Sequence, residues 1–260
     1  MKIMTINILG YGLMGKQIAA LLYLGGFNIH IWNHKHANEK DVLRQIKLLK
    51  RIFNTEVEGK ITFHTDFDDL PDAITIESVI ENLDVKRELY KNFKKSKMLY
   101  FTNSSSFSPS EIGENVNGFH FFNPISLKLL EMHLRDTEMI EDIKPVLEYL
   151  EIIGFDIINV NSNRGYIGNY ILFNEISSAL KLIEKFNYTY EHVNMVYKKL
   201  YDGRNLFTII DLIGIDVVYQ ILKNLKEEDA SIYIPRCLAN ALDKNILGRK
   251  NKTSIKEVLS

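Results

Sequence analysis

A single histidine, His120, stands among aromatic residues in the segment 118–122, directly before an Asn123-Pro124 turn. A neutral imidazole can take the proton of an alcohol, and it does so best when a carboxylate orients the ring. Glu131, eleven residues further along, is the candidate for that carboxylate. A lone histidine in an apolar strand is usually structural, but the polar run 103–106 at the end of the preceding strand favours a catalytic site.

A glycine-rich motif follows the first apolar run of the chain. The pattern G-x-G-x-x-G is matched by Gly10, Tyr11, Gly12, Leu13, Met14 and Gly15. Gly10 would form the tight turn, Gly12 would let the backbone approach a pyrophosphate, and Gly15 would allow close packing of helix on strand. The N-terminus of that helix would offer N–H groups to the phosphates. The motif therefore predicts a dinucleotide site.

The end of the second predicted strand bears on the choice of dinucleotide. An Asp or Glu at this point binds the ribose hydroxyls of NAD, but the residue here is Asn33, followed by His34, Lys35 and His36. With no acidic group and with cations nearby, NADP is an expected cofactor beside NAD. In the alternative interpretation Asn33 binds the 2′-hydroxyl of NAD well enough and its neighbours form a solvated loop. Both interpretations stay open.

Short apolar runs alternate with amphipathic stretches as far as residue 160. The predicted strands are 3–9, 27–32, 61–63, 74–80, 98–103, 118–122 and 156–160, with helical periodicity between them, as in 15–24 and 40–53. Strands separated by helices imply a parallel sheet with right-handed crossovers. Residues 1–162 are therefore expected to form a doubly wound, Rossmann-type α/β domain.

The strand pattern stops at a polar break, residues 161–165. Helices are predicted at 166–186, 190–201, 207–223 and 235–241, so residues 163–260 are expected to form a smaller, all-helical C-terminal domain. The first of these helices carries apolar residues on more than one side, among them Tyr170, Phe173 and Ile176. This excess of apolar surface predicts a homodimer through the helical domain.

Composition excludes several classes of protein. The 260 residues are 46% hydrophobic, with 32 Lys and Arg against 33 Asp and Glu, so a sizeable core is expected and nucleic acid is an unexpected partner. No apolar run approaches the length of a membrane span. One cysteine, Cys237, excludes an internal disulfide. We expect a cytoplasmic protein in a reducing compartment, without a metal site.

These motifs resemble those of the L-3-hydroxyacyl-CoA dehydrogenase family. The resemblance runs through nearly the whole chain in a fixed order, at residues 10–15, 77–86, 103–106, 120–124, 128–131, 165–169 and 211–216. It implies an oxidoreductase of fatty acid metabolism that interconverts (S)-3-hydroxyacyl-CoA and 3-oxoacyl-CoA by hydride exchange with NAD or NADP. It also implies dimerisation through the helical domain.

The resemblance further implies roles for single residues. His120 would be the general acid/base, with Glu131 as its orienting partner. Ser105 would hydrogen-bond the reacting oxygen of the substrate, and Asn169 would reach the substrate from the helical domain. The positions that match the family's dinucleotide site are Glu81, Lys86, Ser105, Asn123 and Lys250.

Four basic residues, Lys40, Arg44, Lys47 and Arg51, share one face of the helix predicted after the second strand. In the family this region lies near the nucleotide end of coenzyme A, whose phosphates a basic face would suit. The alternative is a solvated helix face.

Departures from the family concern the acyl end and the C-terminus. The link between His120 and Glu131 is one residue shorter than the family's, Tyr170 stands where an arginine is usual, and the C-terminal segment 251–255 lacks the usual glycines and aromatics. The substrate handle, coenzyme A or an acyl-carrier protein, therefore stays open.

Three other interpretations are weaker. Dehydrogenases of the 3-hydroxyisobutyrate and 6-phosphogluconate type use a lysine where this chain has Leu172. A non-catalytic relative would not be expected to keep all four catalytic candidates. A metal site at His30, His34 and His36 lacks a nearby acidic or cysteine ligand.

Overall fold

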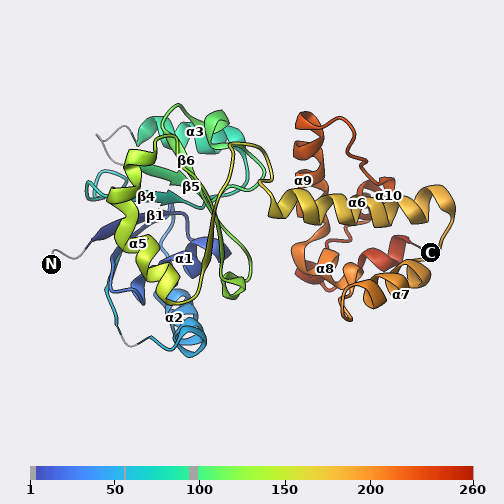
Figure 1. Ribbon diagram of the computed structural model, residues 1–260, viewed down its shortest axis with the longest axis horizontal. Coiled ribbons are helices and arrows are strands. Elements are labelled where there is room, and N and C mark those ends of the chain that lie inside the picture. The colour runs from blue at the N-terminus through green and yellow to red at the C-terminus, as the bar shows by residue number, and fades with distance from the viewer. Residues whose placement is uncertain (1–3, 56, 94–98, 260) are drawn as a thin grey trace. The chain divides into compact units, whose positions relative to one another are not determined.

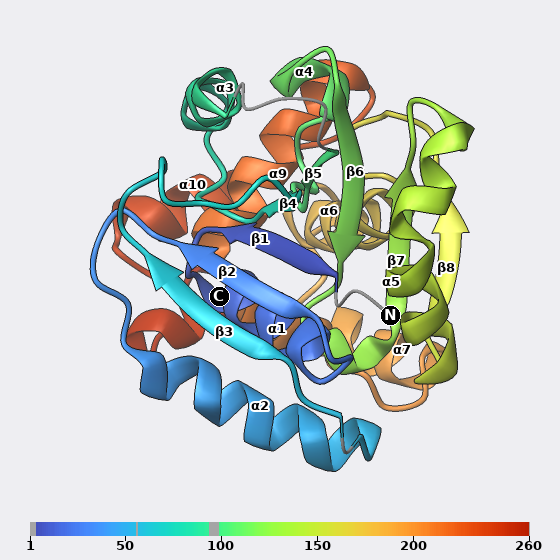
Figure 2. The same cartoon turned by 90° about the vertical axis from the view of Figure 1, so that its left-hand side faces the viewer.

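In the computed structural model, which describes residues 4–55, 57–93 and 99–259, strands alternate with helices through the first unit of the chain, Met1–Asn163. One sheet runs in the order β3-β2-β1-β4-β5-β6-β7-β8 (Figures 1 and 2). Its strands are β1 (Thr5–Leu9), β2 (Asn28–Trp32), β3 (Lys60–His64), β4 (Ile74–Glu77), β5 (Tyr100–Thr102), β6 (Val116–Phe121), β7 (Leu129–His133) and β8 (Asp156–Asn159). The helices of this unit are α1 (Leu13–Tyr23), α2 (Glu39–Phe53), α3 (Leu83–Asn92), α4 (Pro109–Ile112) and α5 (Ile140–Ile152), with 3₁₀ turns η1 (Ile125–Leu127) and η2 (Thr137–Met139).

Helices cover both faces of this sheet because the strands are apolar on both sides. Ile6 and Ile8 of β1 belong to a core shared with α1, α2 and α5, whereas Leu9 joins a second core with residues of α3 and α4. Figure 2 shows α1 and α2 on one side of β1, β2 and β3, with α3 on the other. The strand order reverses at β1 and β4, the place where doubly wound folds bind ligands. The predicted fold class is confirmed.

One strand pair departs from the wholly parallel sheet that the sequence predicted. β6 and β7 are antiparallel, whereas the other neighbouring strands are parallel. β7 itself was not among the predicted strands, because the charge of Glu131 at its centre interrupts an otherwise apolar run. β4 ends at Glu77, not at residue 80. Residues 3 and 98, where two strands were predicted to begin, lie outside the described residues.

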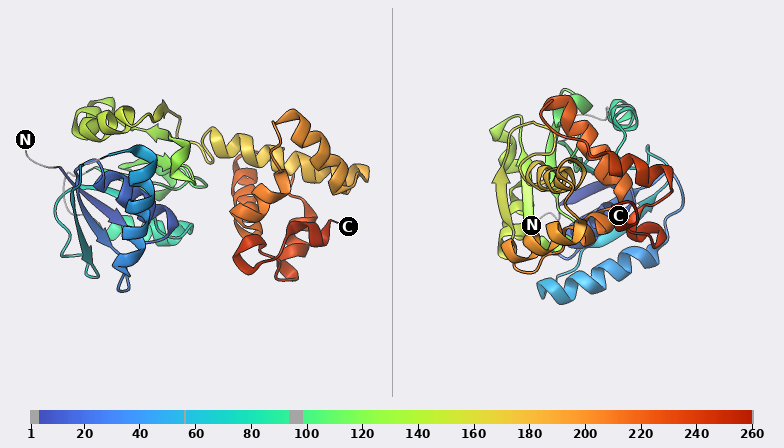
Figure 3. Two further views of the ribbon diagram at one scale, coloured as in Figure 1. Left: turned by 90° about the horizontal axis from the view of Figure 1, so that it is seen from below. Right: turned by 90° about the vertical axis from the view of Figure 1, so that its right-hand side faces the viewer.

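The second unit, Arg164–Ser260, is helical, as predicted. Its helices are α6 (Gly168–Phe186), α7 (Tyr190–Leu200), α8 (Leu206–Ile213), α9 (Ile215–Glu228) and α10 (Arg236–Asp243), followed by 3₁₀ turns η3 (Gly248–Asn251) and η4 (Ile255–Val258). Figure 3 shows α6 as the long helix of this unit, and α7, α9 and α10 contact it. Among the described helices, none has the length and apolarity to cross a membrane.

The prediction of a single helix at 207–223 is wrong. Gly214 breaks it into α8 and α9 with φ of +100°, a conformation that side chains rarely adopt. The pattern of apolar residues continues across the break, so periodicity alone did not reveal it. Phe173 and Ile176 of α6, which suggested an excess of apolar surface, are buried in the core of this unit.

Candidate active site

The turn between β1 and α1 has the geometry that the glycine motif predicts. Gly10 has φ of +104°, and a Cβ there would lie 2.5 Å from the carbonyl oxygen of Ser78. A Cβ on Gly15 would lie 2.2 Å from the carbonyl oxygen of Gly10. A Cβ on Gly12 would meet nothing within 4 Å, so this part of the backbone is open to a ligand. The turn therefore fits a pyrophosphate at the N-terminus of α1.

The remaining motif residues attach this turn to its surroundings. Met14 packs against the core, whereas Leu13 is exposed. The Tyr11 hydroxyl donates to the carbonyl oxygen of Asn38 (2.8 Å) and accepts from the backbone N–H of Val42 (3.0 Å). Burial raises the pKa of Tyr11, which keeps the hydroxyl available as a donor. Tyr11 thus ties the dinucleotide turn to the beginning of α2.

Asn33 directly follows the end of β2 at Trp32. Its backbone N–H donates to the carbonyl oxygen of His64 (3.1 Å), and its side-chain Nδ2 donates to the carbonyl oxygen of Lys35 (2.9 Å). The amide therefore stands at the carboxyl end of β2, where a ribose would lie in a doubly wound fold. No carboxylate occupies this position.

His120 and Glu131 form a buried pair. They lie directly opposite each other in the β6–β7 ladder, and Nδ1 of the imidazole is 2.8 Å from Oε2 of the carboxylate. Because side chains alternate along a strand, both point to the face opposite Phe119, Phe121 and Leu130, which belong to the α1 and α5 core. The exposed fractions are 5% for His120 and 1% for Glu131. The carboxylate is therefore placed to orient the ring.

The shortened link between these strands does not displace the carboxylate. After a cis Asn123-Pro124 peptide, the chain makes the turn η1, and Lys128 then adopts the left-handed conformation with φ of +57°. Gln17 of α1 holds the link: its Oε1 accepts from the N–H of Ile125 (3.0 Å), and its Nε2 donates to Oδ1 of Asn123 (3.4 Å). Sequence reasoning missed Gln17, whose only signal was a polar residue on a buried helix face.

Lys86 and Glu81 belong to a charged cluster at the ends of β4 and β5. Nζ of Lys86 lies 2.8 Å from Oε1 of Glu77 and 3.2 Å from Oε2 of Glu81. Glu81 also accepts from the hydroxyls of Ser104 and Ser106, each at 2.5 Å. Glu77 was not predicted to be a site residue. The sequence signal that could have identified it is a carboxylate at the end of a buried strand.

The charges of this cluster are stabilised by one another. Desolvation disfavours the charged form of Lys86, but Glu77 and then Glu81 more than offset it and raise the pKa of the ammonium. Desolvation likewise opposes ionisation of Glu81, but Lys86 and the hydroxyls of Ser104 and Ser106 lower the pKa of that carboxyl. Both groups are charged at neutral pH.

Ser105 lies between the two serines that bind Glu81. It is half-buried, and its side chain makes no hydrogen bond to the residues that the structure describes.

In the second unit, Asn169 is buried in the first turn of α6, and Nζ of Lys250 lies 2.7 Å from both carboxylate oxygens of Asp216. The structure thus joins Glu81, Lys86 and Ser105 in one loop cluster, whereas Asn169 and Lys250 belong to the other unit.

The three histidines 30, 34 and 36 do not form a cluster. Nδ1 of His30 lies 2.8 Å from Nε2 of His64 on β3, with the rings stacked. Burial and then His64 lower the pKa of His30. Within residues 4–55, 57–93 and 99–259, no group of three His, Cys, Asp or Glu side chains could hold a metal ion.

Comparison with known proteins gives matches along the chain. Residues 5–163 match the family model described as 3-hydroxyacyl-CoA dehydrogenase, NAD binding domain, and residues 165–257 match 3-hydroxyacyl-CoA dehydrogenase, C-terminal domain. The chain is 29% identical to a probable 3-hydroxyacyl-CoA dehydrogenase of Caenorhabditis elegans, covering 96% of this chain and 91% of that protein. It is 26% identical to the 3-hydroxybutyryl-CoA dehydrogenase of Clostridioides difficile, covering 96% and 97%.

Solved structures share the fold. The (S)-3-hydroxybutyryl-CoA dehydrogenase of Ralstonia eutropha superposes with a TM-score of 0.82 at 24% identity, covering 98% of each chain. FadB2 of Mycobacterium tuberculosis gives a TM-score of 0.84 at 23% identity, covering 97% of this chain and 98% of that one.

The glycine turn yields a matched pair of variants. Gly12→Ala is expected to leave the urea unfolding midpoint nearly unchanged but to lower dinucleotide affinity on the order of tenfold, because its Cβ would fill the space that a pyrophosphate needs. Gly15→Ala is expected to destabilise the fold by about 1–3 kcal/mol through its clash with Gly10. Urea unfolding and calorimetric titration with NAD and NADP measure both effects. Unchanged affinity in Gly12→Ala would place the pyrophosphate elsewhere.

Proposed function

Because the chain belongs to the 3-hydroxyacyl-CoA dehydrogenase family, we propose that it interconverts an (S)-3-hydroxyacyl-CoA and a 3-oxoacyl-CoA, with His120 as the acid/base. The family assignment agrees with the resemblance seen in the sequence and makes the chain an oxidoreductase that uses NAD or NADP. The observation that carries the proposal for His120 is its buried 2.8 Å contact with Glu131.

The pair accounts for proton transfer. When bound, the nicotinamide accepts or supplies the hydride. His120 exchanges the proton of the substrate oxygen through Nε2, because Nδ1 is engaged by Glu131. The charge that develops on the imidazole is stabilised by the carboxylate, whose position is fixed by the strand register. Proton and hydride thus leave or reach the same carbon–oxygen unit of the substrate.

Other residues would hold the reactants. Ser105 would donate its hydroxyl to the reacting oxygen, and Asn169 would bind the substrate from the helical unit. The glycine turn 10–15 would hold the pyrophosphate, Asn33 the adenosine ribose, and Glu81, Lys86 and Asn123 the nicotinamide half, with Lys250 contributing from the second unit. The open space at Gly12 supports the placement of the pyrophosphate, and the hydrogen bond from Gln17 of α1 to Asn123 supports that of Asn123.

The handle of the substrate is proposed to be coenzyme A. Lys40, Arg44, Lys47 and Arg51 are all exposed on α2. Within the described part of the chain, Arg44 is the one among these four that forms an ion pair, at 3.6 Å from Asp41. Such a face suits the phosphates of coenzyme A. An acyl-carrier protein is the alternative handle for the same hydroxyacyl group.

His120 is tested by substitution. His120→Gln is expected to lower kcat for acetoacetyl-CoA reduction by roughly a hundredfold or more, the scale of lost acid/base catalysis. Glu131→Gln should lower kcat as well, because a neutral amide stabilises an imidazolium less than a carboxylate does. His133→Gln, on the same strand as Glu131, is the control and should retain parent turnover. Steady-state kinetics with NADH and NADPH measure kcat for the parent and each variant. Full activity in His120→Gln would remove His120 from the mechanism.

Cofactor choice is tested at Asn33. We propose that NADP is used at least comparably with NAD, because Asn33 is neutral and Lys35 lies near. Asn33→Asp should then lower kcat/KM for the NADP reaction about tenfold or more relative to NAD, through repulsion of the 2′-phosphate. Asn28→Asp, at the other end of β2, adds the same charge and should not change the ratio. If the parent strongly prefers NAD and Asn33→Asp leaves this preference unchanged, the proposed placement of the ribose at Asn33 is contradicted.

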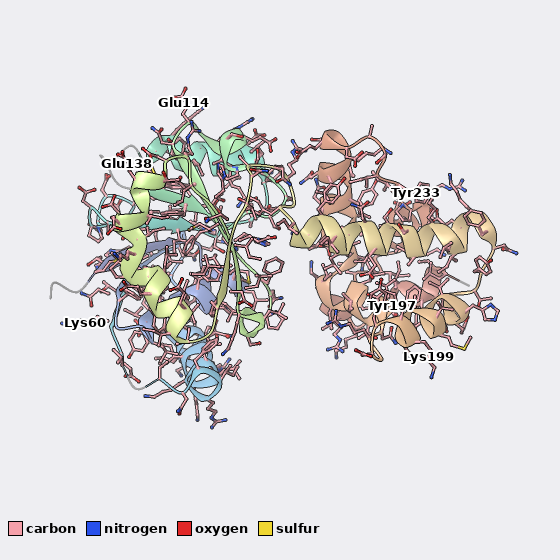
Figure 4. The ribbon with its side chains drawn as sticks, in the orientation of Figure 1. Lys60, Glu114, Glu138, Tyr197, Lys199 and Tyr233 are labelled. Atoms are coloured by element: carbon pink, nitrogen blue, oxygen red, sulfur yellow. The ribbon has the colours of Figure 1, made fainter. Side chains whose placement is uncertain are left out.

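A homodimer through the helical unit is also proposed. An apolar groove of about 560 Å³ lies along α6 and α7, lined by Leu182, Tyr188, Val193, Val196, Leu200 and Tyr201 among others. Tyr197, labelled in Figure 4, joins the two helices through its hydroxyl, which donates to Glu175 (3.0 Å). Leu200 is 71% exposed. Exposed apolar side chains that line one groove together are typical of a protein interface.

Light scattering tests the dimer. The parent is expected to be dimeric at micromolar concentration, and Leu200→Lys is expected to shift it toward monomer because the lysine would place a charge in the interface. Ile152→Lys alters a residue that is 83% exposed in the other unit and should stay dimeric. A monomeric parent would refute the proposal.

A further inference from the structure

Glu77 is a fully buried carboxylate at the carboxyl end of β4, with no exposed surface. Its Oε1 accepts from the N–H of Val79 (2.7 Å) and from Nζ of Lys86 (2.8 Å), and its Oε2 accepts from the hydroxyl of Thr102 (2.7 Å). Three donors from three different segments thus converge on one side chain. A carboxylate this buried is stable only when it is paired and hydrogen-bonded.

The carboxylate forms a triad with Lys86 and Glu81. Lys86 is 1% exposed and lies between the two carboxylates, so the triad carries a net charge of −1. Glu81 in turn binds Ser104 and Ser106, the neighbours of Ser105. Glu77 therefore acts on the serine loop through Lys86 and Glu81, and also through Thr102, whose Oγ1 accepts from the N–H of Ser104 (3.1 Å).

The sheet places this triad between the two halves of the site. Glu77 is the register partner of Leu9, which precedes the glycine turn, and of Thr102, which precedes the serine loop. In the strand order, β4 and β5 lie between β1, which bears the glycine turn, and β6, which bears His120. A dinucleotide whose pyrophosphate lies at Gly12 and whose hydride carbon approaches His120 must pass over the ends of β4 and β5.

The charge of the triad distinguishes the two redox forms of the nicotinamide. The oxidised ring carries a positive charge and the reduced ring does not, so a net negative charge beneath the ring stabilises only the oxidised form. Glu77 contributes strongly because it is shielded from solvent, whereas the Glu81 side chain is 34% exposed. The charge of Glu77 also acts on Tyr100: burial, and then this charge, raise the pKa of the Tyr100 hydroxyl.

We propose that Glu77 is a positioning residue of the dinucleotide site, and that the net charge of the Glu77–Lys86–Glu81 triad makes the site favour the oxidised over the reduced cofactor. This inference rests on the dinucleotide placement proposed above. It assigns to Glu77 a role beyond structural support: it sets the ratio of the two cofactor affinities.

Glu77→Gln tests the proposal, because glutamine keeps the shape and an acceptor for Lys86 but removes the charge. We expect the affinity for NAD⁺ to fall on the order of tenfold relative to that for NADH, the scale of one charge acting across a partly buried site. Glu77→Asp keeps the charge and shortens the side chain, so both affinities should fall while their ratio stays near that of the parent. Glu88→Gln, an exposed change on the same helix as Lys86, is the control and should alter neither.

Dissociation constants are measured by calorimetry, with NADP⁺ and NADPH as a second pair, and each variant is checked by circular dichroism. An affinity ratio for NAD⁺ and NADH that stays at the parent value in Glu77→Gln, whether or not both affinities fall, would overturn the inference. If Glu77→Gln does not fold, Glu81→Gln removes a charge from the exposed end of the triad and must shift the ratio in the same direction. A parent that binds no dinucleotide would refute the proposed function as well. If the parent binds both forms and the variants leave the ratio of the two affinities unchanged, only this inference is refuted.

Discussion

The antiparallel pairing of β6 with β7 is the constraint on which the site depends. In a sheet whose other neighbouring strands are parallel, this reversal brings residue 131 back beside residue 120. Directly opposed residues of an antiparallel pair lie close enough for their side chains to meet on one face. The imidazole–carboxylate contact therefore follows from the ladder itself, and a link one residue shorter leaves it intact because η1 and the left-handed Lys128 close the turn.

Buried charge is the second feature of this site. Glu77, Lys86 and Glu131 are each 0–1% exposed. Removing such groups from water is costly, and an apolar replacement of similar shape is often as stable or more so. Glu77 and Lys86 offset this cost by pairing with each other, and Glu77 also accepts from the hydroxyl of Thr102. Glu131 is paired with His120. Residues of this kind at the carboxyl edge of a sheet are better explained by chemistry than by stability.

Helix α1 connects the parts of the site. Its N-terminus carries the glycine turn, and Gln17 in its middle binds the link between β6 and β7. Tyr11, just before the helix, binds the backbone at the beginning of α2. A displacement of α1 would therefore alter the glycine turn, the Asn123 segment and the helix with the basic face together.

The sequence by itself determined the α/β fold of the first unit, the helical second unit, the glycine turn and the family. These depend on local patterns: strand and helix periodicities differ, and the G-x-G-x-x-G spacing demands a tight turn that can be recognised without knowing its neighbours. The position of Asn33 after β2 was accessible in the same way, because the end of an apolar run marks the end of a strand.

Only the tertiary structure decided which distant residues meet. β7 was not predicted, because a charged residue at the centre of an apolar run resembles a surface position until its partner strand is known. The three donors of Glu77 lie up to 25 residues from it in the sequence, and Gln17 meets a link 108 residues away. The break at Gly214 depends on one backbone dihedral that leaves the apolar periodicity unchanged. Strand pairing and long-range hydrogen bonds are set by the packing of the whole sheet, so local sequence patterns do not specify them.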